Sequence, residues 1–137
     1  MVGMLLLALA PGVALAAEVA SSDGACTGTR NQDSITGTDT TDEILALGGK
    51  DFVDARGGAD EVHGSEGGDR LFGDKNDRAL DGNDEVYGGA IIVYLFGLGG
   101  SDLLDGGPDN DFIFAQEFNE RAKGTTRSSP MTEPRTP

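Results

Sequence analysis

The stretch Gly48–Val62, GGKDFVDARGGADEV, contains the same pattern twice. A Gly pair is followed by one residue, an Asp, one residue and a Val, and this pattern returns nine residues later. Self-similarity at a fixed short period is the sequence signature of a stacked repeat architecture, in which each unit packs mainly against its neighbours. The stretch therefore predicts a repeat-built solenoid.

The same period runs through most of the chain. An Asp recurs every nine residues from Asp33 to Asp69, and after a break the series resumes at Asp84. An aliphatic residue follows two positions after each Asp, and where Val93 replaces the expected Asp, Leu95 keeps the aliphatic position. The Asp residues in phase are Asp33, Asp42, Asp51, Asp60, Asp69, Asp84, Asp102 and Asp111, and the aliphatic residues are Ile35, Ile44, Val53, Val62, Leu71, Val86, Leu95, Leu104 and Ile113.

A nine-residue unit is too short for a helix and its return, but it suits a tight turn followed by a short strand. Side chains of a strand alternate between its two faces, so the aliphatic residue points inward and its neighbours point outward. The Gly residues allow the positive φ angles of a tight turn. Two units form one coil of eighteen residues. We predict an all-β fold, a parallel β-roll (a right-handed β-helix-like solenoid) with a thin aliphatic core.

Stacked coils bring the carboxylates of residues eighteen apart close together, and this repulsion has to be neutralised. A Ca²⁺ ion takes about six to eight oxygen ligands, which carboxylates and the exposed carbonyls of Gly-rich turns can supply. The pattern therefore predicts calcium sites in the turns. The candidate ligands are Asp33, Asp42, Asp51, Asp60, Asp69, Asp84, Asp102, Asp109, Asp111, Gly49, Gly58, Gly67, Gly82 and Gly100.

The pattern resembles the Gly-Gly-x-Gly-x-Asp-x-aliphatic-x nonapeptide of the RTX, or hemolysin-type calcium-binding repeat, family. The fullest matches are Gly97–Leu104 and Gly106–Ile113, followed by Gly64–Leu71. Two further units, which begin Gly28-Thr29 and Gly37-Thr38, resemble the family's edge repeats. The resemblance implies several bound Ca²⁺ ions and a chain that stays unfolded inside the cell and folds outside it.

The phase assigns the Asp residues to two edges of the roll. Val93 should weaken or abolish two sites on the first edge, and the pair Asp60–Asp84 is in doubt because extra residues intervene. One ion per pair of stacked turns gives about four to six ions. Calcium is expected between Asp33 and Asp51, Asp51 and Asp69, Asp42 and Asp60, and Asp84 and Asp102.

The spacing of fifteen between Asp69 and Asp84 indicates an insertion near residues 74–80. Insertions in repeat proteins usually map to loops, so we expect a loop that bulges from one turn. The alternative is an EF-hand loop from Asp74 to Glu85. In that loop Arg78 and Ala79 would stand where an oxygen ligand and the turn glycine belong.

The outward positions of the two sheets differ in character. Those of the second sheet include Glu43, Glu61, His63, Glu85 and Asp105. Those of the first sheet include Phe52, Phe72, Tyr94, Phe96, Phe112 and Phe114. Because an exposed apolar patch usually marks a partner or a covering segment, this aromatic face predicts self-association or docking of a protein. Cover by tail residues such as Phe118 is the other interpretation.

The two ends fall outside the repeat. Residues 1–16 combine a short apolar run with an Ala-x-Ala site before Ala17, which is typical of a secretory signal peptide, although no Lys or Arg precedes the run. We expect a secreted, extracellular protein with a flexible segment at 17–27, the roll at 28–114 and a disordered tail at 115–137, because the tail is polar and without periodicity.

Composition excludes several function classes. The chain of 137 residues has a net charge of −14, which disfavours nucleic acid as a partner. Its apolar run is too short to insert across a membrane. No His-Glu-x-x-His or Gly-x-Ser-x-Gly motif is present, so we expect a calcium-binding protein and no enzyme. Cys26 is the only cysteine and cannot form an internal disulfide. Ice binding is disfavoured because the outward positions form no ladder of Thr.

Overall fold

The computed structural model describes residues 17–20, 24–74, 82–115 and 121–126. Within these residues every regular element is a strand, and every pairing between strands is parallel. None of the described residues forms a helix long and apolar enough to cross a membrane. The strands are β1 (Ala17–Ala20), β2 (Ala25–Thr27), β3 (Asp33–Thr36), β4 (Glu43–Leu45), β5 (Gly48–Gly49), β6 (Phe52–Asp54), β7 (Glu61–Gly67), β8 (Arg70–Phe72), β9 (Glu85–Ala90), β10 (Tyr94–Phe96), β11 (Leu103–Phe114) and β12 (Arg121–Thr126).

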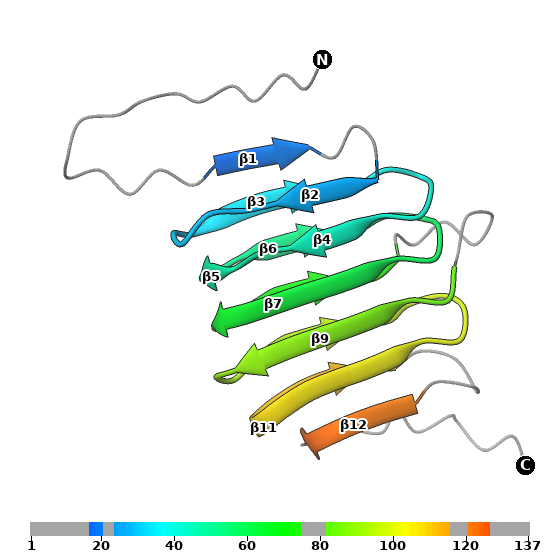
Figure 1. Ribbon diagram of the computed structural model, residues 1–137. Coiled ribbons are helices and arrows are strands. Elements are labelled where there is room, and N and C mark those ends of the chain that lie inside the picture. Colours follow the sequence, from blue (N-terminus) through cyan, green and yellow to red (C-terminus); the bar gives the residue numbers. More distant parts are fainter. Residues whose placement is uncertain (1–16, 21–23, 75–81, 116–120, 127–137) are drawn as a thin grey trace, which may run out of the picture.

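The strands stack in two parallel sheets, with β1, β2 and β3 at one end of the stack and β11 and β12 at the other (Figure 1). The chain alternates between the sheets, so each coil adds one strand to each. The long strand β11 contributes its last residues to the first sheet and its first residues to the second. The order is β1-β3-β6-β8-β10-β11 in the first sheet and β2-β4-β7-β9-β11-β12 in the second.

Two columns of apolar side chains fill the space between the sheets. Every aliphatic residue expected to point inward is buried there, with Ile113 the most exposed at 6 %. The period of two along each short strand thus places one side chain per strand in the core. The columns are Ile35, Val53, Leu71, Leu95 and Ile113 in the first sheet, and Cys26, Ile44, Val62, Val86 and Leu104 in the second. The predicted parallel β-roll is confirmed.

The insertion does not disturb this stack. Leu71 pairs with Leu95 and Val62 with Val86, which are 24 residues apart instead of eighteen. The strands on both sides of the insertion therefore keep their places, as expected for a loop that bulges from one turn. Residues 75–81 themselves lie outside the described residues.

The EF-hand alternative does not fit the described part of this segment. Glu85 is exposed on β9 and accepts a hydrogen bond from the Tyr87 hydroxyl at 2.8 Å. Asp74, by contrast, is buried. An EF-hand loop would need both side chains on one ion, and they do not converge.

Both ends of the roll extend further than the repeat predicts. Cys26 lies in β2 and fills the inward position beside Ile44, so the boundary expected at Gly28 is too late. Cysteine behaves as a small apolar side chain, which explains why it can stand in an aliphatic column. Residues 121–126 of the expected disordered tail form β12, which pairs with the open edge of β11. The expected signal peptide at 1–16 and residues 116–120 and 127–137 of the expected tail lie outside the described residues.

Candidate metal sites on the two edges of the roll

A column of carboxylates lines the first edge of the roll. Asp33, Asp51, Asp69 and Asp111 are all at least 98 % buried at the start of first-sheet strands. Where the next coil carries an Asp, the backbone N–H of the in-phase residue donates to that carboxylate. The hydrogen bonds run from Asp33 to Asp51 Oδ1 at 2.8 Å, from Asp51 to Asp69 Oδ1 at 2.9 Å and from Val93 to Asp111 Oδ1 at 3.2 Å.

The second edge carries an equivalent column, and it is continuous. The backbone N–H groups of Asp42, Asp60 and Asp84 donate to the next carboxylate at 2.9, 2.9 and 3.0 Å. The pair Asp60–Asp84 is therefore formed as closely as the others, because β7 and β9 pair in register across the insertion. Asp102 is the last Asp of this column among the described residues.

The second oxygen of these carboxylates points into the turn. Among the described residues, Oδ2 is buried and lacks a hydrogen-bond donor in Asp51, Asp60, Asp69, Asp84 and Asp111. Asp69 Oδ2 packs against the start of its own turn, since a Cβ atom on Gly64 would lie 2.7 Å from it. A buried ionised carboxylate oxygen without a donor is costly, and a cation is the partner that removes this cost. An all-oxygen set of this kind suits a hard cation such as Ca²⁺.

Burial shifts the acidity of these groups. Loss of solvent raises the pKa of Asp51 to about 6, of Asp60 to about 7 and of Asp84 to about 8, from an ordinary value of 3.8. The hydrogen bond from the preceding coil opposes the rise, and neighbouring carboxylates add to it. Burial also raises the pKa of Asp69 and Asp111. Without a cation, burial therefore makes the ionised carboxylates less favourable in the folded turns than in the unfolded chain.

The glycines of the turns have a steric reason to be glycine. Gly67, Gly82 and Gly100 each lie so close to the coil before that a Cβ atom would overlap a glycine carbonyl oxygen. Gly67 and Gly100 also have φ of +138° and +99°, a region that other residues avoid. The carbonyls of Gly49, Gly58 and Gly82 thus face the next turn along each edge. That these carbonyl oxygens bind calcium stays a prediction.

Comparison with protein families decides which repeat this is. The model of the RTX calcium-binding nonapeptide repeat matches four times, at residues 27–62, 36–71, 78–90 and 94–119, which together make up more than half of the chain. The chain belongs to the RTX calcium-binding repeat family. Calcium is therefore the ion that its Asp-rich turns bind. The comparisons with curated proteins and with solved structures gave no match.

The first two RTX units differ from the later ones in how their Asp residues are held. The Thr29 backbone N–H donates to Asp33 Oδ2, and the Thr29 hydroxyl lies 3.1 Å from Asp33 Oδ1. In the next unit, the Thr38 backbone N–H and hydroxyl contact Asp42 Oδ2 at 2.6 and 3.0 Å. Oδ2 of these two carboxylates has protein donors, whereas none of the described residues donates to Oδ2 of Asp51, Asp60, Asp69, Asp84 and Asp111. The Gly-Thr start of both units was the sequence signal for this difference.

Two positions of the RTX pattern fall outside the carboxylate columns. Val93 is fully buried, and its Cγ2 would lie 2.5 Å from a Cβ atom on Gly88. In the turn of Asp69, the equivalent position beside Gly64 is occupied by the carboxylate oxygen Asp69 Oδ2. In the turn of Val93 a methyl group takes this position, which fits the expected loss of calcium sites at Val93. Asp109, a predicted ligand, is exposed on β11, and after burial its charge adds to the raised pKa of Asp111; its role as a ligand stays a prediction.

Proposed function

We propose that this chain is a secreted calcium-dependent folding module, unfolded without Ca²⁺ and folded in millimolar extracellular Ca²⁺. The observation that carries the proposal is the burial of carboxylate oxygens that have no donor, at Asp51, Asp60, Asp69 and Asp84. Burying them ionised opposes folding, and binding an ion that only the folded turns can hold favours it. Extracellular calcium modules bind at roughly 10⁻⁴ to 10⁻³ M, which matches this use.

The number of ions follows from the carboxylate pairs. Hydrogen bonds join five pairs of successive Asp residues along the two edges. Two of these pairs include Asp33 or Asp42, which the Thr29 and Thr38 donors already serve. We expect ions first between the other three pairs, which are Asp51–Asp69, Asp60–Asp84 and Asp84–Asp102.

A calcium titration followed by far-ultraviolet circular dichroism tests this function, with Mg²⁺ as the control ion. We expect a cooperative gain of β signal near millimolar Ca²⁺ and little response to Mg²⁺. Asp51→Ala should shift the midpoint to higher Ca²⁺, because Asp51 takes part in two pairs. Asp39→Ala is the matched control, since Asp39 is exposed. A chain that has its full β signal in chelator, or that ignores Ca²⁺, would rule the proposal out.

A second candidate function is adhesion through the outer face of the first sheet. The described rings form a nearly continuous stack, with centroid distances of 5.4 Å for Phe52–Phe72, 4.4 Å for Phe72–Phe96 and 4.7 Å for Phe96–Phe114. Beside it Tyr94 stacks on Phe112 at 4.8 Å. Phe52, Tyr94 and Phe114 are more than a third exposed. Stacked rings stabilise the sheet, but their exposed edges suit a partner surface.

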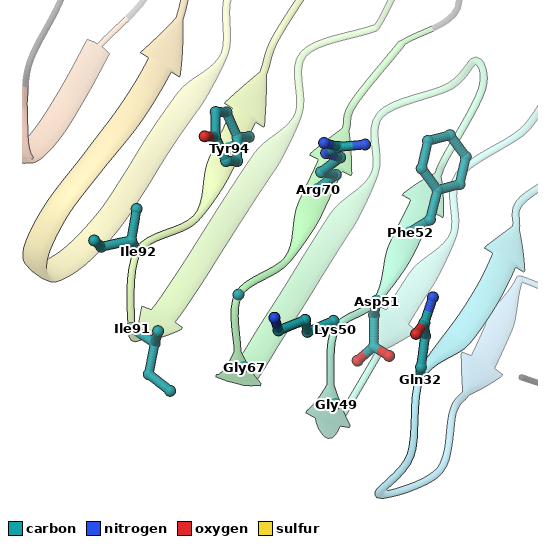
Figure 2. Close-up of a pocket in the computed structure, with 11 residues that line it drawn as sticks. Gln32, Gly49, Lys50, Asp51, Phe52, Gly67, Arg70, Ile91, Ile92 and Tyr94 are labelled. Atoms are coloured by element: carbon teal, nitrogen blue, oxygen red, sulfur yellow. The ribbon is translucent and has the colours of Figure 1, made fainter. Parts of the chain in front are cut away.

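The same face offers cations beside the rings. The Arg70 guanidinium lies 5.8 Å from the Tyr94 ring. Figure 2 shows Phe52, Arg70 and Tyr94 on successive strands of the first sheet, beside Lys50 and the turn with Ile91 and Ile92, where they line a groove. The outer face of the second sheet instead stacks Glu43, Glu61 and Glu85 in register. This contrast in charge favours contact between unlike faces of two copies.

Sedimentation in saturating Ca²⁺ tests the adhesive function. Phe52→Ser and Tyr94→Ser should each reduce association of the wild-type chain, while both variants still fold. Glu43→Gln, on the opposite face, should weaken it as well if unlike faces meet. A wild-type chain that stays monomeric at high concentration in Ca²⁺ would remove self-association from the account.

A further inference from the structure

We propose that Asp74 is a third carboxylate ligand of the calcium site between Asp84 and Asp102, supplied by the insertion and outside the nine-residue pattern. The inference rests on the proposed function, because it assumes that the paired Asp turns bind Ca²⁺. It adds a ligand that the repeat does not contain, and it makes this site different from the others on both edges.

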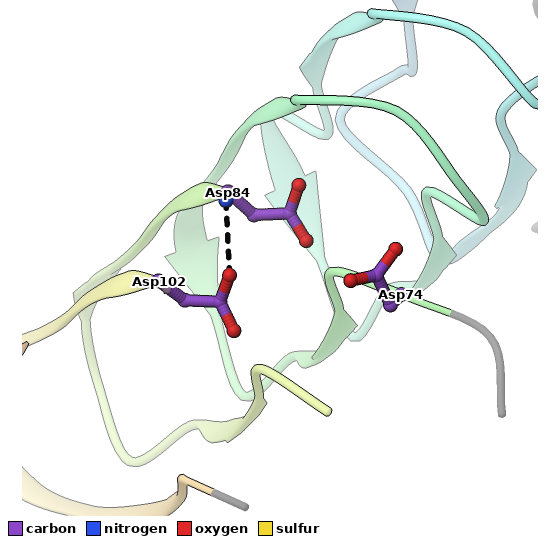
Figure 3. Close-up of side chains that lie close together, drawn as sticks. All are labelled: Asp74, Asp84 and Asp102. Atoms are coloured by element: carbon purple, nitrogen blue, oxygen red, sulfur yellow. Dashed lines mark hydrogen bonds between the residues drawn. The ribbon is translucent and has the colours of Figure 1, made fainter. Parts of the chain in front are cut away.

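The three carboxylates converge. One oxygen from each of Asp74, Asp84 and Asp102 lies within 4.8 Å of the other two, and all three residues are at least 98 % buried. Figure 3 shows the Asp74 carboxylate facing the other two, with the Asp84 backbone N–H bonded to Asp102 Oδ1 at 3.0 Å. Three ionised carboxylates held together away from solvent repel one another, and either protonation or a cation among them relieves this repulsion.

A second observation points to a ligand at this place. Asp84 Oδ2 is buried and has no hydrogen-bond donor among the described residues. It packs against Gly73, the residue directly before Asp74, where a Cβ atom would overlap it. The oxygen is therefore aimed at the turn that carries Asp74. Because no described protein group donates to this oxygen, a cation is the partner that best compensates its burial.

Asp74 is held in place by backbone contacts on both sides of the insertion. Its N–H donates to the Gly97 carbonyl at 3.2 Å, which ties it to the next coil. Its carboxylate accepts the N–H of Gly82 at 3.2 and 3.3 Å, which ties it to the far side of the insertion. The same place in the turns before and after is taken by Arg56 and Leu98. Asp74 thus gives this gap a carboxylate that the neighbouring turns do not have.

The extra charge sets the expected properties of the site. Among the described residues, the site between Asp84 and Asp102 is the only one at which three carboxylates converge. Ligand charge is one of the main factors that tune calcium affinity, so this site should fill first. Three negative charges also exceed the charge of Ca²⁺, so a trivalent ion such as La³⁺ should compete here more strongly than at two-carboxylate sites. Asp74 and Asp102 also contribute to the raised pKa of Asp84.

Calorimetric titration of the full chain with Ca²⁺ tests the inference through Asp74→Asn. Asparagine keeps an oxygen for the Gly82 N–H and removes only the charge. We expect the tightest site to weaken by at least about tenfold and its preference for La³⁺ over Ca²⁺ to fall. Asp39→Asn, which removes one exposed charge, should leave both unchanged. Asp74→Glu, which restores the charge, should recover most of the loss.

The outcomes separate this inference from the proposed function. If the wild-type chain binds no Ca²⁺, the proposed function fails and the inference fails with it. If the wild-type chain binds Ca²⁺ and Asp74→Asn behaves like Asp39→Asn, only the inference is overturned. If Asp74→Asn and Asp74→Glu lose affinity equally, Asp74 acts through packing and is no ligand. If Asp74→Asn cannot fold even in saturating Ca²⁺ but Asp74→Glu can, the charge is required and the inference stands.

Discussion

Asp60→Asn should have opposite effects on folding with and without calcium. Asn keeps the oxygen that accepts the Asp42 N–H at 2.9 Å, and it removes a charge whose second oxygen is buried without a donor. The rise of the Asp60 pKa from 3.8 to about 7 corresponds to roughly 4 kcal/mol at about 1.4 kcal/mol per pKa unit. Relaxation of the turn around the buried charge reduces this to about 2 kcal/mol.

The amide group of Asn also carries a cost, because its N–H₂ replaces an oxygen that has no partner. An unsatisfied buried donor costs about 1 kcal/mol or more, so the net gain in folding free energy is about 1 kcal/mol in chelator at neutral to basic pH. In Ca²⁺ the sign reverses. Asp60 belongs to two carboxylate pairs, with Asp42 and with Asp84, so the variant should need several-fold more Ca²⁺ to fold.

Circular dichroism measures both arms. In chelator, the chain is driven toward its folded state with trimethylamine N-oxide, an osmolyte that favours burial. Asp60→Asn should fold at a lower osmolyte concentration than the wild-type chain, and Asp39→Asn should match the wild type. In a Ca²⁺ titration the order should invert. If Asp60→Asn needed more osmolyte than the wild type, the buried carboxylate would be a stabilising part of the metal-free fold, and the reasoning would be wrong.

Three further predictions follow from the same turns. In chelator, lowering the pH from about 8 to about 5.5 should stabilise the roll. The raised pKa values of Asp51 and Asp84 contribute stability that is fully present below about pH 4 and is lost as the pH rises through about 6 for Asp51 and about 8 for Asp84. In Ca²⁺ the dependence on pH should reverse. Gly100→Ala should lower the free energy of unfolding by about 2 kcal/mol or more in a denaturant titration, because φ is +99° and a Cβ would overlap the Gly82 carbonyl. The control Gly68→Ala, whose Cβ would lie 3.4 Å from its nearest atom, should lower it by less than about 1 kcal/mol. Cys26 is buried and burial raises its thiol pKa, so alkylation should be slow in Ca²⁺ and fast in chelator; equal rates in both would contradict calcium-linked folding of the first coil.

The phase of the repeat was sufficient to place the core and both carboxylate columns. A residue in phase has the same surroundings in every coil, so one rule assigns Val53, Leu71 and Leu95 alike. The doubt over Asp60–Asp84 arose because spacing counts residues, and it does not show that an inserted loop leaves the stack between coils intact.

Residues outside the phase could not be placed in this way. Thr29 acts on Asp33 through the shape of its turn, which the period does not describe. Asp74 meets Asp84 and Asp102 only once the coils are stacked. Their positions follow from three-dimensional packing, and a single sequence carries no rule for them.

The most direct test of the account counts bound calcium and folding on the same samples. Equilibrium dialysis against increasing Ca²⁺ gives the ions bound per chain, and circular dichroism of the dialysed protein gives the folded fraction. At least three ions should bind, one for each of the pairs Asp51–Asp69, Asp60–Asp84 and Asp84–Asp102, with the same midpoint as the β signal. A β signal that is complete before calcium binds, or binding without any change in that signal, would contradict it.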